Sequence, residues 1–175
     1  MKKSYGEVYL VGCGPGDPEL LTLKGLRLLK EADFVIHDRL INPRILDFTK
    51  QNAEIIDVGK DSNSANIQQE KIHQIIIEKA KMGKKVIRLK GGDPFLFGRG
   101  GEESEILRKN NIPFQVVPGV TSAIAAPSYA GIPVTHRRVA SSVTFVSGNE
   151  DISKLNSNIN WNAIGNTGGT IVVLM

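Results

Sequence analysis

The sequence has one cysteine, Cys13, and this scarcity narrows the classes of protein it can encode. A single thiol excludes an internal disulfide framework and a cysteine-based zinc site. All apolar runs are far shorter than the roughly 20 residues that a membrane-spanning helix needs. The N-terminal residues pass straight into a strand-like run, without the apolar core of a signal peptide. We therefore expect a cytoplasmic protein with no membrane partner.

Long runs of one charge are also absent. No run of Lys or Arg exceeds two residues, so the basic arm or tail typical of nucleic-acid binding is missing and we expect no nucleic-acid partner. The net charge of +4 nevertheless suits a polyanionic ligand. With 41% hydrophobic and 23% charged residues, the 175-residue chain falls outside the disordered and fibrous classes.

Glycine, by contrast, is abundant. The chain has 18 glycines, about 10% of its residues against a usual ~7%, and they cluster at residues 12–16, 91–92 and 98–101. Such clusters are typical of loops that turn sharply or bring bare backbone close to a ligand.

Strand and helix patterns alternate along the first two thirds of the chain. Short apolar runs predict strands, and helical spacing with caps predicts the segments between them. The expected strands are residues 5–11, 34–37, 54–58, 86–90 and 114–117, and the expected helices are residues 22–32, 66–83 and 101–109, the first of them capped by Thr22. This alternation predicts an α/β fold: a mostly parallel five-stranded sheet with helices on both faces.

The pattern changes after residue 118. A small-residue helix over 121–130 precedes strands over 142–147 and 170–175, with a helical turn near Trp161 between them. We expect residues 1–118 to form an N-terminal α/β domain that carries the catalytic loops. Residues 119–175 would begin a second α/β domain, present only in part because the chain stops inside a core strand.

The loop after the first strand, residues 12–18, has some features of a dinucleotide-binding fingerprint. That fingerprint needs glycine where this chain has Asp17, and Pro15 lacks the N–H that a phosphate cradle would use. Both residues disfavour a nicotinamide-dependent oxidoreductase. A tight strand-to-helix turn is the alternative interpretation of the loop.

Two ionisable residues follow successive strands, Asp38 after the second and Lys60 after the third. Residues at such positions are commonly solvated surface charges. Their shared sheet edge, however, allows Asp38 to accept a proton and Lys60 to donate one in a single cleft.

The densest combination of glycine, aromatic and charged residues spans 88–101. Strand alternation places Arg88 and Lys90 on one face, opposite Ile87 and Leu89. Gly91 and Gly92 then allow a ligand to lie against backbone, beside Asp93. The apolar residues 95–97 either wall a pocket or pack on the following helix.

The three histidines show no ligand spacing, so we assign no metal. Cys13 is most simply a small turn residue.

Together, these loops resemble the tetrapyrrole (precorrin-type) methyltransferases, over essentially the whole chain and in the family's order. The segments that carry the resemblance are residues 8–17, 37–40, 58–60, 88–103, 117–122 and 135–137. The resemblance implies two α/β domains, a homodimer, and S-adenosylmethionine bound between the domains, with S-adenosylhomocysteine as product. It implies cofactor contacts at Pro15, Gly91, Gly92, Asp93, Leu96, Thr121, Ser122 and Met175.

Within the family, the resemblance is closest to the members that methylate carbon atoms of uroporphyrinogen III, and it implies conversion of that substrate to precorrin-2 in two steps, on the branch toward siroheme and cobalamin. The resemblance implies that Asp38 accepts and Lys60 donates a proton. The substrate carboxylates would be collected by Arg39, Lys90, Arg99 and Arg137. Two alternatives stay open: another substrate of this family (a precorrin, a ribosomal RNA ribose or a diphthine-type residue), or an inactive truncated module.

Overall fold

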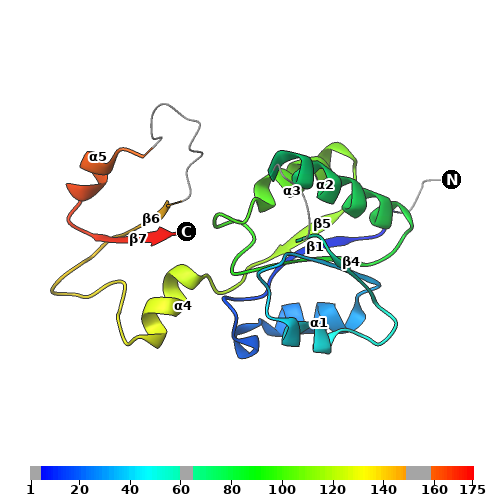
Figure 1. The fold of residues 1–175 in the computed structure, drawn as a ribbon, viewed down its shortest axis with the longest axis horizontal. Coiled ribbons are helices and arrows are strands. Elements are labelled where there is room, and N and C mark those ends of the chain that lie inside the picture. Colours follow the sequence, from blue (N-terminus) through cyan, green and yellow to red (C-terminus); the bar gives the residue numbers. More distant parts are fainter. Residues whose placement is uncertain (1–4, 60–64, 149–158) are drawn as a thin grey trace. The chain divides into compact units, whose positions relative to one another are not determined.

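The computed structural model describes residues 5–59, 65–148 and 159–175 and divides the chain into two compact units, Met1–Thr121 and Ser122–Met175 (Figure 1). The first unit contains β1 (Val8–Gly12), η1 (Pro18–Leu20), α1 (Leu23–Glu31), β2 (Phe34–His37), η2 (Pro43–Phe48), β3 (Glu54–Asp57), α2 (Ala65–Lys81), β4 (Val86–Lys90), α3 (Gly100–Lys109) and β5 (Phe114–Val117). The second contains α4 (Ser122–Tyr129), β6 (Val143–Ser147), α5 (Trp161–Gly165) and β7 (Thr170–Leu174).

The first unit is built on a five-stranded sheet of order β3-β2-β4-β1-β5, in which every neighbouring pair is parallel. Figure 1 shows α1 on one side of this sheet and α2 and α3 on the other. The predicted five-stranded parallel sheet with helices on both faces is confirmed.

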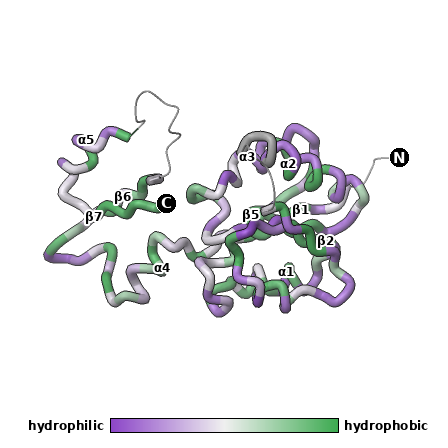
Figure 2. Tube along the Cα trace, viewed as in Figure 1, coloured by the Kyte–Doolittle hydropathy of each residue, from purple (hydrophilic) through white to green (hydrophobic). Residues whose placement is uncertain are grey.

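Residues alternate between the two faces of the sheet because successive side chains of a strand point in opposite directions. Val11 lies in one core cluster with Leu28 of α1, whereas Leu10 lies in the other with Leu107 of α3. The central strands β1, β2 and β4 are buried throughout, as expected for a parallel sheet covered on both faces. Figure 2 shows this hydrophobic centre beneath helices of mixed hydropathy.

The observed boundaries follow the sequence signals closely. Thr22 caps α1 as expected, its hydroxyl accepting a hydrogen bond from the N–H of Gly25 over 3.0 Å. The first strand begins at Val8, later than residue 5, because Gly6 instead donates its N–H to Ala80 at the end of α2.

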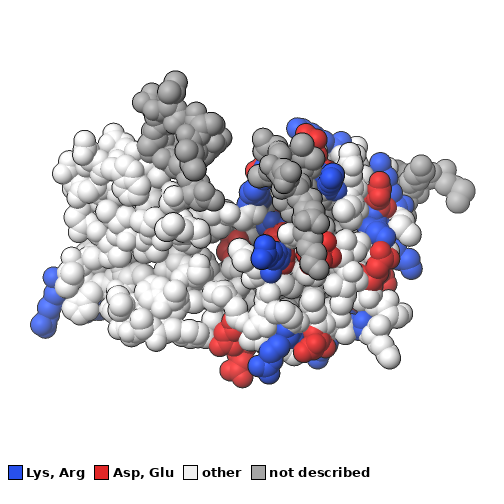
Figure 3. Space-filling view, in the orientation of Figure 1, with Lys and Arg blue, Asp and Glu red and all other residues white. Residues whose placement is uncertain are grey.

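The second unit contains a two-stranded parallel sheet of β6 and β7, with α4 in contact with β7. Over its described ranges, 122–148 and 159–175, its charged side chains are those of Arg137 and Arg138. Figure 3 shows the contrast between this nearly uncharged surface and the charged surface of the first unit. In the part of the chain that the structure describes, no helix is long and apolar enough to span a membrane.

Candidate active site

Loops at the carboxyl edge of the sheet diverge around β4. The chain leaves β1 and β2 toward α1 and η2 on one face, but leaves β4 toward α3 on the other. Ligands of open α/β sheets bind at this kind of switch in direction, beyond the carboxyl ends of the strands. The topology therefore places the candidate site where the residues after β1, β2 and β4 meet.

The loops after β1 and β4 are joined by backbone hydrogen bonds. Gly92 donates its N–H to the carbonyl of Gly14 over 2.7 Å, and Gly14 donates to the carbonyl of Gly92 over 3.3 Å. This bridge uses amides that a phosphate cradle would need free. The structure thus agrees with the inference, drawn from Pro15 and Asp17, that the loop is not a dinucleotide fingerprint.

The glycines at this edge fall into two groups. A Cβ on Gly119 would lie 2.1 Å from the carbonyl oxygen of Gly92, and one on Gly12 would lie 2.5 Å from the same atom, so close packing excludes side chains there. Gly91 is different, because a Cβ would meet only the Leu40 carbonyl at 3.8 Å. Open space beside the backbone of Gly91 is what a bound ligand requires.

Asp93, expected to contact the cofactor, uses its carboxylate within the protein. Its Oδ1 accepts hydrogen bonds from the N–H groups of Phe95 (2.8 Å) and Leu96 (3.0 Å), and its Oδ2 accepts one from Gly119 (3.1 Å). The carboxylate therefore shapes the loop and ties it to the segment after β5.

The rest of that loop is strained and open to solvent. Phe97 and Arg99 adopt left-handed conformations, with φ of 53° and 55°, which non-glycine residues rarely do. Phe95 and Phe97 are about half exposed and do not pack fully on α3. Backbone strain of this kind commonly accompanies ligand-binding loops.

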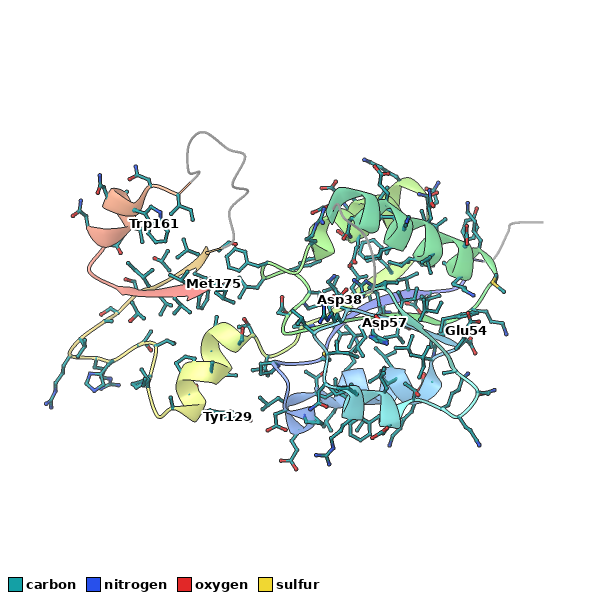
Figure 4. All side chains as sticks on the ribbon, in the orientation of Figure 1. Asp38, Glu54, Asp57, Tyr129, Trp161 and Met175 are labelled. Carbon is teal, nitrogen blue, oxygen red and sulfur yellow. The ribbon has the colours of Figure 1, made fainter. Side chains whose placement is uncertain are left out.

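A buried network of charges lies beside the site. Arg88, 1% exposed, donates through Nε to Oε1 of Glu103 (2.9 Å) and through Nη2 to Oδ1 of Asp38. Lys90 Nζ lies 3.1 Å from the same Oε1 of Glu103 and 3.8 Å from Oδ2 of Asp38. Only Asp38, labelled in Figure 4 at the end of β2, reaches solvent, with 35% of its side chain exposed.

The two cations of the network respond differently to burial. Burial acts to lower the pKa of Arg88, but the adjacent carboxylates of Glu103 and Asp38 outweigh it and raise that pKa above its usual range. For Lys90, burial together with the neighbouring charge of Arg88 lowers the pKa below the ordinary value of lysine. Arg88 is therefore the permanent cation that faces Asp38.

Glu103 was not among the site residues expected from the sequence, so the acid that partners Arg88 was missed. A usable signal was present: β4 is a central parallel strand covered on both faces, so charged residues within it must find buried partners. What the sequence could not supply was which acid does so, because Glu103 lies 15 positions from Arg88.

The other candidate residues lie as follows. Arg39 is exposed. It lies directly against Gly59: a Cβ atom added to Gly59 would be 2.3 Å from the Cβ atom of Arg39. The segments after β2 and β3 therefore meet immediately before Lys60, which itself lies outside the described residues. Arg99 makes a two-point ion pair with Glu102, at 2.8 and 2.7 Å.

The candidate cofactor residues belong to both units: Thr121 is the last residue of the first unit, and Ser122 and Met175 are exposed residues of the second. Arg137, expected to bind substrate, is an exposed residue of the second unit. Within the described ranges, no group of three His, Cys, Asp or Glu side chains could hold a metal ion. Cys13 is buried, and burial raises the pKa of its thiol to about 12.

Among the described residues, the open backbone of Gly91 and the carboxylate of Asp93 lie at the carboxyl edge of a parallel sheet, next to a switch in strand direction. This is the class of α/β fold whose members commonly bind small molecules at that edge. Residues 7–175 match the sequence model of the tetrapyrrole (corrin/porphyrin) methylases. The chain belongs to this family.

Named relatives agree with that assignment. The chain is 55% identical over its whole length to an S-adenosyl-L-methionine-dependent uroporphyrinogen III methyltransferase of Methanosarcina barkeri, and spans 69% of that protein. It is 52% identical over 97% of its length to the siroheme synthase of Nitrosomonas eutropha, of which it spans 35%. The crystal structure of a Thermus thermophilus uroporphyrin-III C-methyltransferase with S-adenosylhomocysteine is 47% identical, with a TM-score of 0.70 over 83% of this chain and 57% of that one.

Proposed function

We propose that the protein methylates carbon atoms of uroporphyrinogen III with S-adenosylmethionine, adding two methyl groups in succession to give precorrin-2. The observation that carries the proposal is the partly exposed Asp38 carboxylate, which Arg88 holds at the same sheet edge as the open backbone of Gly91. The choice of substrate is supported by the 55% identity to the Methanosarcina barkeri methyltransferase.

The open backbone of Gly91 leaves room for S-adenosylmethionine at the sheet edge. When bound, that cofactor supplies an electrophilic methyl group, and the electron pair of the broken carbon–sulfur bond stays on sulfur. The proposed contacts remain Pro15, Gly91, Gly92, Asp93, Leu96, Thr121, Ser122 and Met175. Since three N–H groups take most of the acceptor capacity of the Asp93 carboxylate, we assign the cofactor contact mainly to its backbone.

Proton transfer falls to Asp38. The new carbon–carbon bond leaves positive charge in the ring system, which returns to neutrality when a proton passes to the carboxylate of Asp38. Lys60 is the proposed proton donor. Arg39, Arg99 and Arg137 would bind the substrate carboxylates, and Lys90 would contribute its charge from beneath Asp38.

We further propose a homodimer in the cytoplasm. The exposed apolar side chains of Leu23 and Leu40 are available for subunit contacts, and the single cysteine suits a reducing compartment.

The decisive test is an anaerobic assay of the full-length protein with S-adenosylmethionine and freshly prepared uroporphyrinogen III. Product mass should increase by two methyl groups. Absence of product, with S-adenosylhomocysteine still bound, would point to another tetrapyrrole, a ribose or a protein side chain as substrate.

A further inference from the structure

Glu103 is completely buried in the first turn of α3, although its side chain is ionisable. Its Oε1 accepts hydrogen bonds from Arg88 and Lys90, while its Oε2 has no hydrogen-bond partner among the residues that the structure describes. A buried acid with one unpartnered oxygen costs folding free energy. A role beyond stability would explain why it is there.

Arg88 connects this acid to the site. Its Nη1 donates to the carbonyls of Ile36 (3.4 Å) and Leu89 (3.3 Å), so strand backbone holds one corner of the guanidinium. Its Nε contacts Glu103, and its Nη2 contacts Asp38. Because the guanidinium is planar and rigid, fixing its Nε and Nη1 atoms also determines the direction in which Nη2 donates its hydrogen bond to Asp38.

We propose that Glu103 is a positioning residue, which acts through Arg88 to fix the orientation of the Asp38 carboxylate toward the substrate. The inference rests on the proposed role of Asp38 as proton acceptor. Small errors in the placement of such a group lower the rate of proton transfer strongly. Without the charge of Glu103, the Nε of Arg88 would lose its anchor, and Lys90, whose Nζ already lies 3.8 Å from Oδ2 of Asp38, would move closer to that carboxylate.

A purely structural ion pair would look the same in the structure but behave differently in a double-mutant cycle. Glu103→Gln keeps the shape and one acceptor oxygen while it removes the charge. If Glu103 works through Asp38, its effect on kcat must disappear once Asp38 is already replaced. A general loss of stability would instead lower kcat by the same factor in either background.

The experiment measures single-turnover methylation of uroporphyrinogen III by the full-length protein carrying Glu103→Gln, Asp38→Asn or both. The matched control is Glu105→Gln, a change to an exposed acid of the same helix. We expect Glu103→Gln to lower kcat by about 10- to 100-fold, with KM and the affinity for S-adenosylhomocysteine changed by less than about twofold. In the Asp38→Asn background the same change should alter kcat by less than about twofold.

An equal loss of kcat in both backgrounds would overturn the positioning role and leave the proposed function intact. Wild-type kcat in Asp38→Asn would overturn the role of Asp38 and the inference with it, and an inactive wild-type protein would overturn the proposed function itself. Should Glu103→Gln fail to fold, Arg88→Lys interrupts the same series of contacts, since it keeps the charge but loses the planar fork. The same cycle with Asp38→Asn then decides the question.

Discussion

The side chain of Asp93 and the backbone of Gly119 connect two loops that follow different strands, with Oδ2 of Asp93 accepting the N–H of Gly119 over 3.1 Å. The other oxygen of Asp93 accepts two N–H groups of its own loop. One carboxylate therefore shapes the loop after β4 and holds it against the segment after β5. Both lie at the proposed cofactor site.

Replacing Asp93 with Asn should loosen this connection. The amide retains one acceptor oxygen, so one of the two loops would face an NH₂ group and lose its hydrogen bond. We expect a loss of about 1–3 kcal/mol in the free energy of unfolding and weaker binding of S-adenosylhomocysteine, measured by calorimetry. Asp47→Asn, at an exposed acid in η2, is the control. Unchanged affinity in Asp93→Asn would separate the loop from the cofactor site.

Gly91 and Gly119 should respond in opposite ways to alanine. At Gly91 the new methyl group has space within the protein, so stability should stay within about 0.5 kcal/mol of wild type while cofactor affinity falls. At Gly119 the methyl group would lie 2.1 Å from the carbonyl oxygen of Gly92, so the protein should lose more than about 3 kcal/mol. Urea unfolding and S-adenosylhomocysteine titration of both variants test this. Full affinity in Gly91→Ala would contradict ligand contact at that residue.

Asp38→Asn should lower the rate of methylation without weakening cofactor binding. The amide oxygen can still accept the hydrogen bond of Arg88, but the side chain no longer accepts a proton. We expect kcat to fall by about 10²- to 10⁴-fold, with S-adenosylhomocysteine affinity near that of wild type, and Lys60→Ala to lower kcat as well. Equal losses of affinity and kcat would mean that Asp38 supports the fold and not the reaction.

The buried charges should contribute to activity more than to stability. Glu103→Gln alone leaves two buried cations with one acid and should cost about 3–5 kcal/mol. Removing the acid together with both of its cations, in the triple variant Arg88→Met, Lys90→Met and Glu103→Leu, should recover most of that loss, because well-packed apolar side chains commonly replace buried ion pairs without a net penalty. Its kcat should stay low. A triple variant as unstable as Glu103→Gln would show that the ion pairs themselves stabilise the fold.

Cys13 should make the protein less stable in alkali. Its folded pKa of about 12 lies above the ordinary 9.0, so between these values the unfolded chain releases a proton that the folded chain retains. Stability is therefore complete below pH 9 and falls as the pH rises from 9 toward 12. At pH 10 the loss attributable to Cys13 should be about 1 kcal/mol. The difference in unfolding free energy between wild type and Cys13→Ala, compared at pH 7 and pH 10, measures it, and an unchanged difference would contradict the raised pKa.

Much of the architecture was predictable because its signals are local. The cap at Thr22 and the opposite faces taken by Arg88 and Leu89 each depend on neighbours in the sequence, and each is confirmed. The start of β1 was placed too early because Gly6 is committed to a distant hydrogen bond with Ala80. The position of Glu103 could not be predicted, since it depends on how α3 packs on β4.

The sequence by itself determined the family, the alternation of strands and helices, and the edge of the sheet where polar loops gather, because periodicity and motif order are properties of the chain. Only the tertiary structure decided which glycines are packed and which are open, that the carboxylate of Asp93 is occupied by backbone N–H groups, and that Arg88 links Asp38 to Glu103. Those relationships join residues far apart in sequence, and packing of strands and helices alone sets the distances between them.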